Sequence, residues 1–94
     1  MKTPGNEHRP YTLEYLESVV NEDIPALPKT QKALIKRAIE ERLATDPAGF
    51  GKPLRFSLKG HRRLRVGDWR VIYRIEGTHV IITAIAHRKD VYEQ

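Results

Sequence analysis

Residues 61–87 read HRRLRVGDWRVIYRIEGTHVIITAIAH, and this stretch decides the fold. Apolar and polar residues alternate with a period of two in three runs, which is the pattern of half-buried β-strands. Short pairs that contain glycine separate the runs and suit tight two-residue hairpin turns. The runs are residues 61–66, 69–76 and 80–87, and the pairs are Gly67-Asp68 and Gly77-Thr78. The stretch therefore predicts three antiparallel strands joined as a β-meander.

The two short turns also determine which strand residues lie opposite one another. Two-residue loops place Val66 opposite Trp69 and Glu76 opposite His79. One face is then almost wholly apolar and is expected to be the core: Leu64, Val66, Trp69, Val71, Tyr73, Ile75, Val80, Ile82, Ala84 and Ala86. The other face is expected to be cationic and open to solvent: His61, Arg63, Arg65, Arg70, Ile72, Arg74, Ile81, Thr83, Ile85 and His87.

The residues before the meander predict the elements that cover its apolar face. Residues 29–45 carry an apolar stripe at helical spacing, and this helix ends at Asp46-Pro47 because the residue before a proline disfavours the α conformation. Residues 17–26 end at prolines and allow only a short helix. Residues 11–16 alternate as a short strand, although they could instead open that helix, and residues 48–53 are expected to be a loop. The predicted fold class is α+β, with an N-terminal strand and two helices on one face of a small antiparallel sheet in the order β-α-α-β-β-β.

Length and composition limit the classes of protein to which the chain can belong. Its 94 residues fit a single domain, and 39% hydrophobic with 31% charged residues is typical of a folded globular protein. No run approaches the roughly 18 to 20 apolar residues of a membrane span, and residues 1–10 lack the apolar core of a signal peptide. We therefore expect a cytoplasmic protein that is one domain over residues 1–94, with residues 1–10 as a flexible extension. Cysteine is absent, which excludes disulfides, thiol nucleophiles and thiolate metal sites.

Positive charge is concentrated in one segment. The net charge is +5, and residues 51–74 hold eight lysines and arginines against a single acid, Asp68. Such a segment attracts polyanions such as nucleic acid or an acidic protein, although a basic surface also serves solubility. The predicted register places Arg65 opposite Arg70, and like charges facing each other across a sheet are destabilising. We therefore expect an anion to bind this face; the alternative is that the arginines splay apart in solvent.

The chemistry available to a cationic face follows from what the sequence contains. The four histidines show no metal-ligand spacing and no glycine-rich phosphate loop follows a strand, so we expect no metal and no cofactor. Metal-free RNA cleavage remains, in which the ribose 2′-hydroxyl attacks its own phosphate. It needs a proton acceptor, a proton donor and fixed positive charge. Residues 86–92, AHRKDVY, place His87, Arg88, Lys89 and Tyr92 at the end of the last strand, where Tyr92 serves either chemistry or packing.

The C-terminal half of the chain resembles the RelE/ParE superfamily of toxin-antitoxin toxins. The resemblance lies in DPAGFGKPL, residues 46–54, and in LKGHRRLRVGDWRVIYRIEGTHVIITAIAHRKDVYEQ, residues 58–94, whose motifs occur in family order and spacing. It implies a toxin that enters the ribosomal A site, cleaves mRNA and thereby inhibits translation. It also implies a RelB-like cognate antitoxin that holds the toxin inactive in a hetero-oligomer, and no membrane partner.

The resemblance also implies roles for individual residues. Arg70 and Arg88 match arginines that stabilise the reacting phosphate, and Tyr92 matches a C-terminal tyrosine that stacks on a base or assists proton transfer. His61 and Arg63 stand where some members have lysines, and arginine is a poor base because its pKa lies above about 12. His87 or His61 is therefore the better candidate proton acceptor. The residues expected to bind RNA are His61, Arg63, Arg65, Arg74 and Lys89.

Two other functions remain open at this point. The ParE branch shares the fold and poisons DNA gyrase without being a nuclease, and a third class would be an inert module that only binds the antitoxin. The terminal HRKDVY, residues 87–92, favours the RNA-cleaving branch, since ParE-like chains usually lack the tyrosine there.

Overall fold

The computed structural model describes residues 9–91, and the strands in this part of the chain form one five-stranded sheet in the order β1-β5-β4-β3-β2. Its strands are β1 (Thr12–Tyr15), β2 (Lys52–Pro53), β3 (Arg62–Val66), β4 (Trp69–Glu76) and β5 (His79–His87). β1 runs parallel to β5, and the other neighbouring pairs are antiparallel. The predicted meander and N-terminal strand are confirmed. The predicted loop over residues 48–53 is wrong in part, because these residues complete a short helix and form the edge strand β2.

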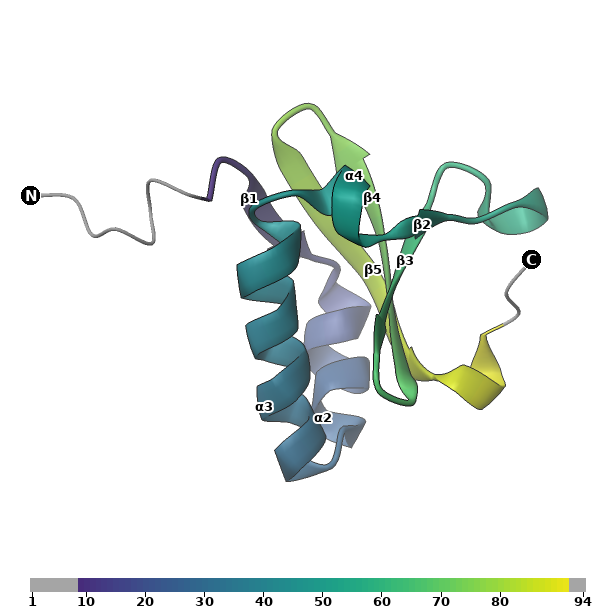
Figure 1. Cartoon of the computed structure of the whole chain (residues 1–94). Coiled ribbons are helices and arrows are strands. Elements are labelled where there is room, and N and C mark those ends of the chain that lie inside the picture. The colour runs from purple at the N-terminus through teal and green to yellow at the C-terminus, as the bar shows by residue number, and fades with distance from the viewer. Residues whose placement is uncertain (1–8, 92–94) are drawn as a thin grey trace, which may run out of the picture.

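Two helical segments cover one face of the sheet (Figure 1). The first consists of a π-helical segment, Val19–Asp23, followed by α2 (Ile24–Ala26). The second is α3 (Lys29–Ala38), which continues as a π-helical segment, Ile39–Leu43, and thus confirms the helix predicted over residues 29–45. A one-turn helix, α4 (Pro47–Phe50), follows, capped by the Asp46 side chain, which accepts a hydrogen bond from Gly49 N. None of the helices formed by residues 9–91 is both long and apolar enough to cross a membrane.

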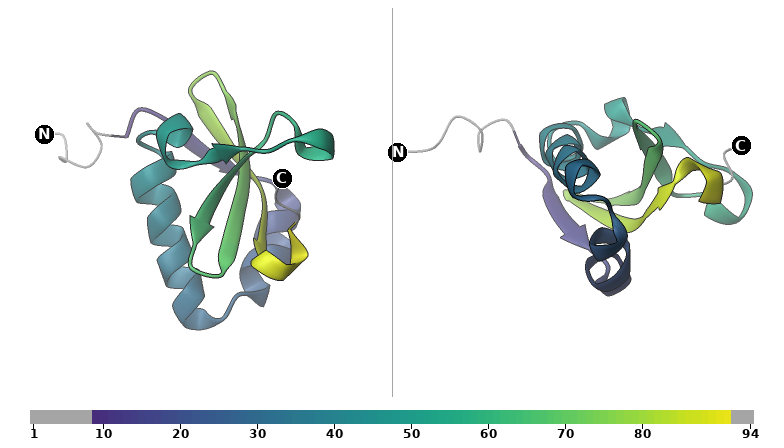
Figure 2. Two further views of the ribbon diagram at one scale, coloured as in Figure 1. Left: turned by 45° about the vertical axis from the view of Figure 1, so that its right-hand side comes forward. Right: turned by 90° about the horizontal axis from the view of Figure 1, so that it is seen from below.

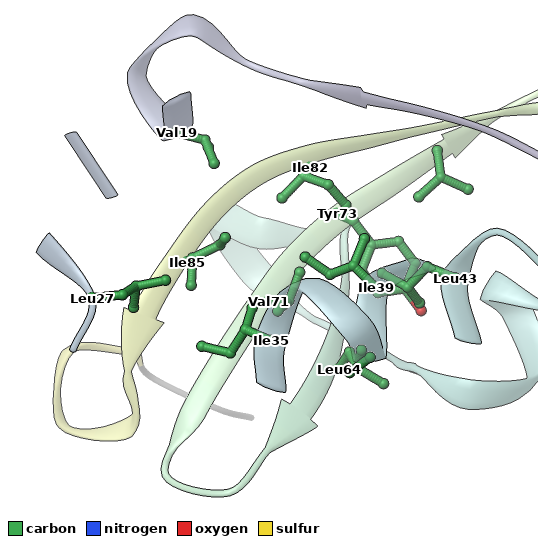
Figure 3. Close-up of a cluster of buried hydrophobic side chains, with 12 residues drawn as sticks. Val19, Leu27, Ile35, Ile39, Leu43, Leu64, Val71, Tyr73, Ile82 and Ile85 are labelled. Atoms are coloured by element: carbon green, nitrogen blue, oxygen red, sulfur yellow. The ribbon is translucent and has the colours of Figure 1, made fainter. Parts of the chain in front are cut away.

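The core lies between these helices and the sheet (Figure 3). Its buried members come from both layers: Val19, Leu27, Ile35, Ala38, Ile39, Leu43, Leu64, Val71, Tyr73, Val80, Ile82 and Ile85. Tyr73 is fully buried, and its hydroxyl donates to the Pro47 carbonyl at 2.5 Å, so that the middle of the sheet is tied to the start of α4. Full burial of one apolar core side chain, such as a valine, leucine or isoleucine, stabilises the fold by about 1.5 to 3 kcal/mol.

The register of the meander matches the prediction up to the middle of β5. Val66 pairs with Trp69, Arg65 with Arg70, and Glu76 with His79. A β-bulge then interrupts the ladder, because Tyr73 pairs with Ile82 whereas Ile72 pairs with Ala84.

The extra residue at the bulge is Thr83, and it exchanges the two faces for the rest of β5. Ile85 was expected on the cationic face but lies in the core. Ala84 and Ala86 were expected in the core but lie beside Ile72 and Arg70 on the opposite face, and His87 lies beside Trp69. The predicted faces are therefore wrong beyond Thr83.

Candidate functional site

The sheet face opposite the helices carries a groove of about 430 Å³, which we call the open-face groove. Its floor consists of Ile72 from β4 and Thr83, Ala84 and Ala86 from β5. One wall is formed by residues 55–58, including the 3₁₀ turn Phe56–Leu58, and the other contains Asp90 and Val91 at the C-terminal 3₁₀ turn, Arg88–Asp90. These two segments project from the side of the sheet away from the helices, as Figure 1 and the right-hand view of Figure 2 show.

The β-bulge produces the shape of this floor. Because Thr83 is the extra residue, the small side chains of Ala84 and Ala86 point to the open face and leave room above the sheet. The Thr83 hydroxyl donates to the Ile72 carbonyl at 3.3 Å and thereby helps to hold the bulge. The end of β5 is fixed from the other side by Asp23, whose carboxylate accepts a hydrogen bond from Ile85 N at 2.9 Å.

Cationic side chains occupy the sheet positions next to this floor. Cross-strand pairing forms one row of Lys52, Arg63, Ile72 and Ala84, and a second row of Arg65, Arg70 and Ala86. Neighbouring strands lie about 4.8 Å apart, so the backbones of these arginines stand one or two strands from the floor. Arg63 and Arg65 also line a separate hollow of about 120 Å³. Arg65 is exposed and Arg63 is half-buried.

Arg70 differs from the prediction in one respect. It lies on the predicted face, but only 4% of it is exposed, so the expectation of a solvent-exposed Arg70 is wrong. Its guanidinium turns back onto the β3–β4 hairpin, where Nη1 donates to the carbonyl oxygens of Gly67 and Trp69, both at 3.0 Å. These bonds fix the direction of its charge.

The β3–β4 hairpin also anchors the C-terminal turn. Arg88 N donates to the Asp68 carbonyl oxygen at 2.8 Å, and Arg88 Nε lies 3.7 Å from the Asp68 carboxylate. Both side chains are largely exposed, and an ion pair of this kind contributes at most about 1 kcal/mol. Arg88 is therefore placed next to the groove mainly by its backbone. Lys89 follows it and is also exposed.

Four residues predicted for the site lie elsewhere or outside the described chain. His87 packs edge-on against Trp69, with ring centroids 5.3 Å apart, on the face opposite to the groove floor. His61 lines a separate hollow of about 240 Å³ together with Pro53, Gly60, Arg62 and Ile75. Arg74 pairs with Ile81 towards the other end of the sheet and donates from Nε to Glu76 at 2.5 Å. Tyr92 lies outside the described residues.

Phe56 in the groove wall was not among the site residues predicted from the sequence, although its neighbour Arg55 is one of the eight cations of residues 51–74. The available signal was an aromatic residue between basic ones in a segment too short to be a strand. Among residues 9–91, no group of three or more His, Cys, Asp or Glu side chains is arranged to hold a metal ion.

Comparison with known proteins identifies the family. The model of the family described as the ParE toxin of type II toxin-antitoxin systems matches residues 12–92. The chain belongs to this family. The toxin is 33% identical over 87 residues to Toxin RelG of Mycobacterium tuberculosis, a match that covers 90% of this chain and 99% of that protein. It is 38% identical over 72 residues to Toxin RelE of the same organism, which covers 74% of each.

A solved structure agrees with these relatives. The toxin matches a chain of the toxin-antitoxin complex RelBE2 from Mycobacterium tuberculosis with a TM-score of 0.78 and 33% identity, over 84% of this chain and 99% of that one. The resemblance to the RelE/ParE superfamily and the predicted α+β fold are thus confirmed, and the protein is a toxin of a type II toxin-antitoxin system.

Proposed function

We propose that this toxin is a ribosome-dependent endoribonuclease that cleaves mRNA without a metal ion, acts in the cytoplasm, and is held inactive by a RelB-like antitoxin in a hetero-oligomer. Relatives named RelG and RelE and the RelBE2 complex support the assignment. The observation that carries it is the open-face groove, whose uncharged floor is bordered by Arg63, Arg65 and Arg70. This combination suits an RNA strand, with its phosphates at the cationic border.

Arginine side chains supply the electrostatic part of the proposed mechanism. Attack of a ribose 2′-hydroxyl on the adjacent phosphate builds up negative charge on the phosphorane oxygens, and preorganised cations stabilise that charge. Arg70 is held in place by two carbonyl oxygens, and Arg88 stands on the turn that closes the groove. We assign both to the phosphate, Arg63, Arg65 and Lys89 to RNA binding, and Tyr92 to the base or to proton transfer.

The histidines fit proton acceptance poorly in this conformation. His87 Nδ1 accepts a hydrogen bond from Lys89 N at 3.2 Å, so a neutral His87 carries its proton on Nε2 and can donate it rather than accept one. His61 lines a different hollow. Lys89 and Tyr92 are therefore candidates for the proton acceptor, in addition to the histidines.

The test uses one preparation in two assays. Toxin added to a translating extract should cut mRNA, detected as new 5′ ends by primer extension, while supercoiling by DNA gyrase continues unchanged. Arg88→Ala should lower the cleavage rate by about 10² to 10³, the usual loss on removing one electrostatic stabiliser of a transition state. Arg37→Ala is the matched control, since Arg37 is also an exposed arginine, paired with Glu41 on α3 away from the groove. Equal cleavage by both variants would remove Arg88 from the site.

Gyrase inhibition is the second candidate, and the description of the matching family as ParE toxin favours it. Uncut transcripts together with inhibited supercoiling would establish that activity in place of RNA cleavage. No effect in either assay would leave a module that only binds the antitoxin.

A further inference from the structure

Phe56 is an exposed aromatic side chain on the wall of the open-face groove. It is 74% exposed, more than any other large hydrophobic residue described in the structure. Its side chain therefore contributes little to the core, and the bulk of the ring is available to a ligand.

The backbone at Phe56 is held in an unfavourable conformation. Its φ of 56° is the only positive φ at a residue other than glycine within residues 9–91. Residues with a Cβ rarely adopt this left-handed region, and such conformations concentrate at binding and catalytic sites. A glycine would fit the turn without strain, so the turn alone does not call for an aromatic residue.

The surroundings of Phe56 match the chemistry of a nucleotide. Arg55 precedes it in the same wall, and the floor opposite presents the small side chains of Ala84 and Ala86. A planar apolar ring beside a fixed cation is the arrangement with which proteins bind single-stranded RNA, because the base stacks on the ring while the phosphate meets the cation.

We propose that Phe56 is a stacking platform for one nucleobase of an RNA strand lying in the open-face groove. The proposal rests on the RNA-directed function proposed above and adds a base contact to it. A protein segment packing on Phe56 is the competing use of the ring. The cationic border of the groove favours RNA, and measuring the binding of both RNA and the cognate antitoxin to the same variants separates the two uses.

The experiment measures, by fluorescence anisotropy at low salt, the binding of a fluorescein-labelled single-stranded RNA. The RNA carries 2′-O-methyl groups, so that it cannot be cleaved. Phe56→Leu keeps an apolar side chain but removes the ring, and Phe56→Tyr keeps the ring. Leucine should raise the Kd about 5- to 140-fold, the range equivalent to losing one stacked base, and tyrosine should leave it near the parent value. Leu34→Ala is the control, because Leu34 is also an exposed large hydrophobic residue, at 50%, and it lies on α3, on the side of the sheet away from the groove.

Each outcome decides the proposal. Weak binding by Phe56→Leu, with parental binding by Phe56→Tyr and Leu34→Ala, supports it. Parental binding by Phe56→Leu overturns it, and if the parent still cleaves mRNA the proposed function stands alone. Weakened antitoxin binding by Phe56→Leu, with RNA binding intact, would assign the ring to a protein partner instead. A parent that neither binds RNA nor cleaves mRNA would remove both the function and the stacking role.

Discussion

Replacing Gly51 by alanine should destabilise the fold strongly, because a methyl group at this position meets atoms that cannot move. Gly51 is buried between α4 and β2, and an added Cβ would lie 1.8 Å from Tyr73 Oη and 3.0 Å from the Arg63 carbonyl oxygen. Tyr73 is fully buried and its hydroxyl is bonded to Pro47, so the ring has no space into which it can retreat.

The magnitude follows from two costs. Overpacking of a tight core costs about 1 to 3 kcal/mol, and loss of the Tyr73–Pro47 hydrogen bond leaves buried polar atoms unpaired at about 1 to 3 kcal/mol. The sum is about 2 to 6 kcal/mol, and at roughly 4 to 8 °C per kcal/mol for a domain of this size the Tm should fall by at least about 8 °C.

Thermal unfolding of Gly51→Ala, Tyr73→Phe and the double variant tests this account. Tyr73→Phe removes the oxygen that the methyl group would strike, so the double variant should lose less stability than the sum of the two single variants, by at least about 1 kcal/mol. Strict additivity, or a Gly51→Ala protein as stable as the parent, would show that the contact is not the cause.

Two further predictions concern pH and backbone strain. Burial raises the pKa of Tyr73 above 10.0, and burial together with the nearby Glu40 raises that of Tyr15. The neutral tyrosines therefore contribute stability that is present below pH 10 and is lost as the pH rises towards the folded-state pKa. Denaturant midpoints should fall above pH 10, and less steeply in Tyr15→Phe and Tyr73→Phe; equal slopes in parent and variants would contradict the assignment. Phe56→Gly should leave stability unchanged or raise it by up to about 1 kcal/mol, because relief of strain offsets the greater freedom of the unfolded chain, while RNA binding falls as in Phe56→Leu. Clear destabilisation by Phe56→Gly in the same thermal assay would mean that the ring serves the fold.

The sequence was sufficient to predict those parts of the fold that depend on local rules. The two-residue turns determined the pairing of Arg65 with Arg70 and of Glu76 with His79, and proline ended the long helix where expected. The pairing of β2 with β3 was not predictable in the same way. β2 has only two residues, one of them Pro53, and its identity depends on contact with a strand elsewhere in the chain.

The candidate site was predicted less well, because its details depend on tertiary contacts. Arg63 and Arg65 lie on the predicted face beside the groove floor. The burial of Arg70 could not be read from alternation, since it results from bonds to the hairpin carbonyls. The position of His87 depends on the bulge at Thr83, four residues earlier in β5.

The bulge itself has a physical cause in the composition of β5, whose residues 80–86 read VIITAIA. Apolar residues stand on both faces here, so alternation alone cannot select a register. Without the extra residue Thr83, an unbroken ladder would place Ala84 and Ala86 against the helices and would leave Ile85 on the open face. Burial of an isoleucine stabilises the fold by about 1.5 to 3 kcal/mol, far more than burial of an alanine methyl. The fold is therefore more stable with one residue inserted and Ile85 turned inwards.

In the folded protein Ile85 is 4% exposed and its amide is bonded to Asp23. The same rearrangement turns the two alanines outwards and so creates the floor of the groove. The core and the candidate site therefore depend on the same bulge, and a larger side chain at residue 84 or 86 would fill the groove without adding to the core.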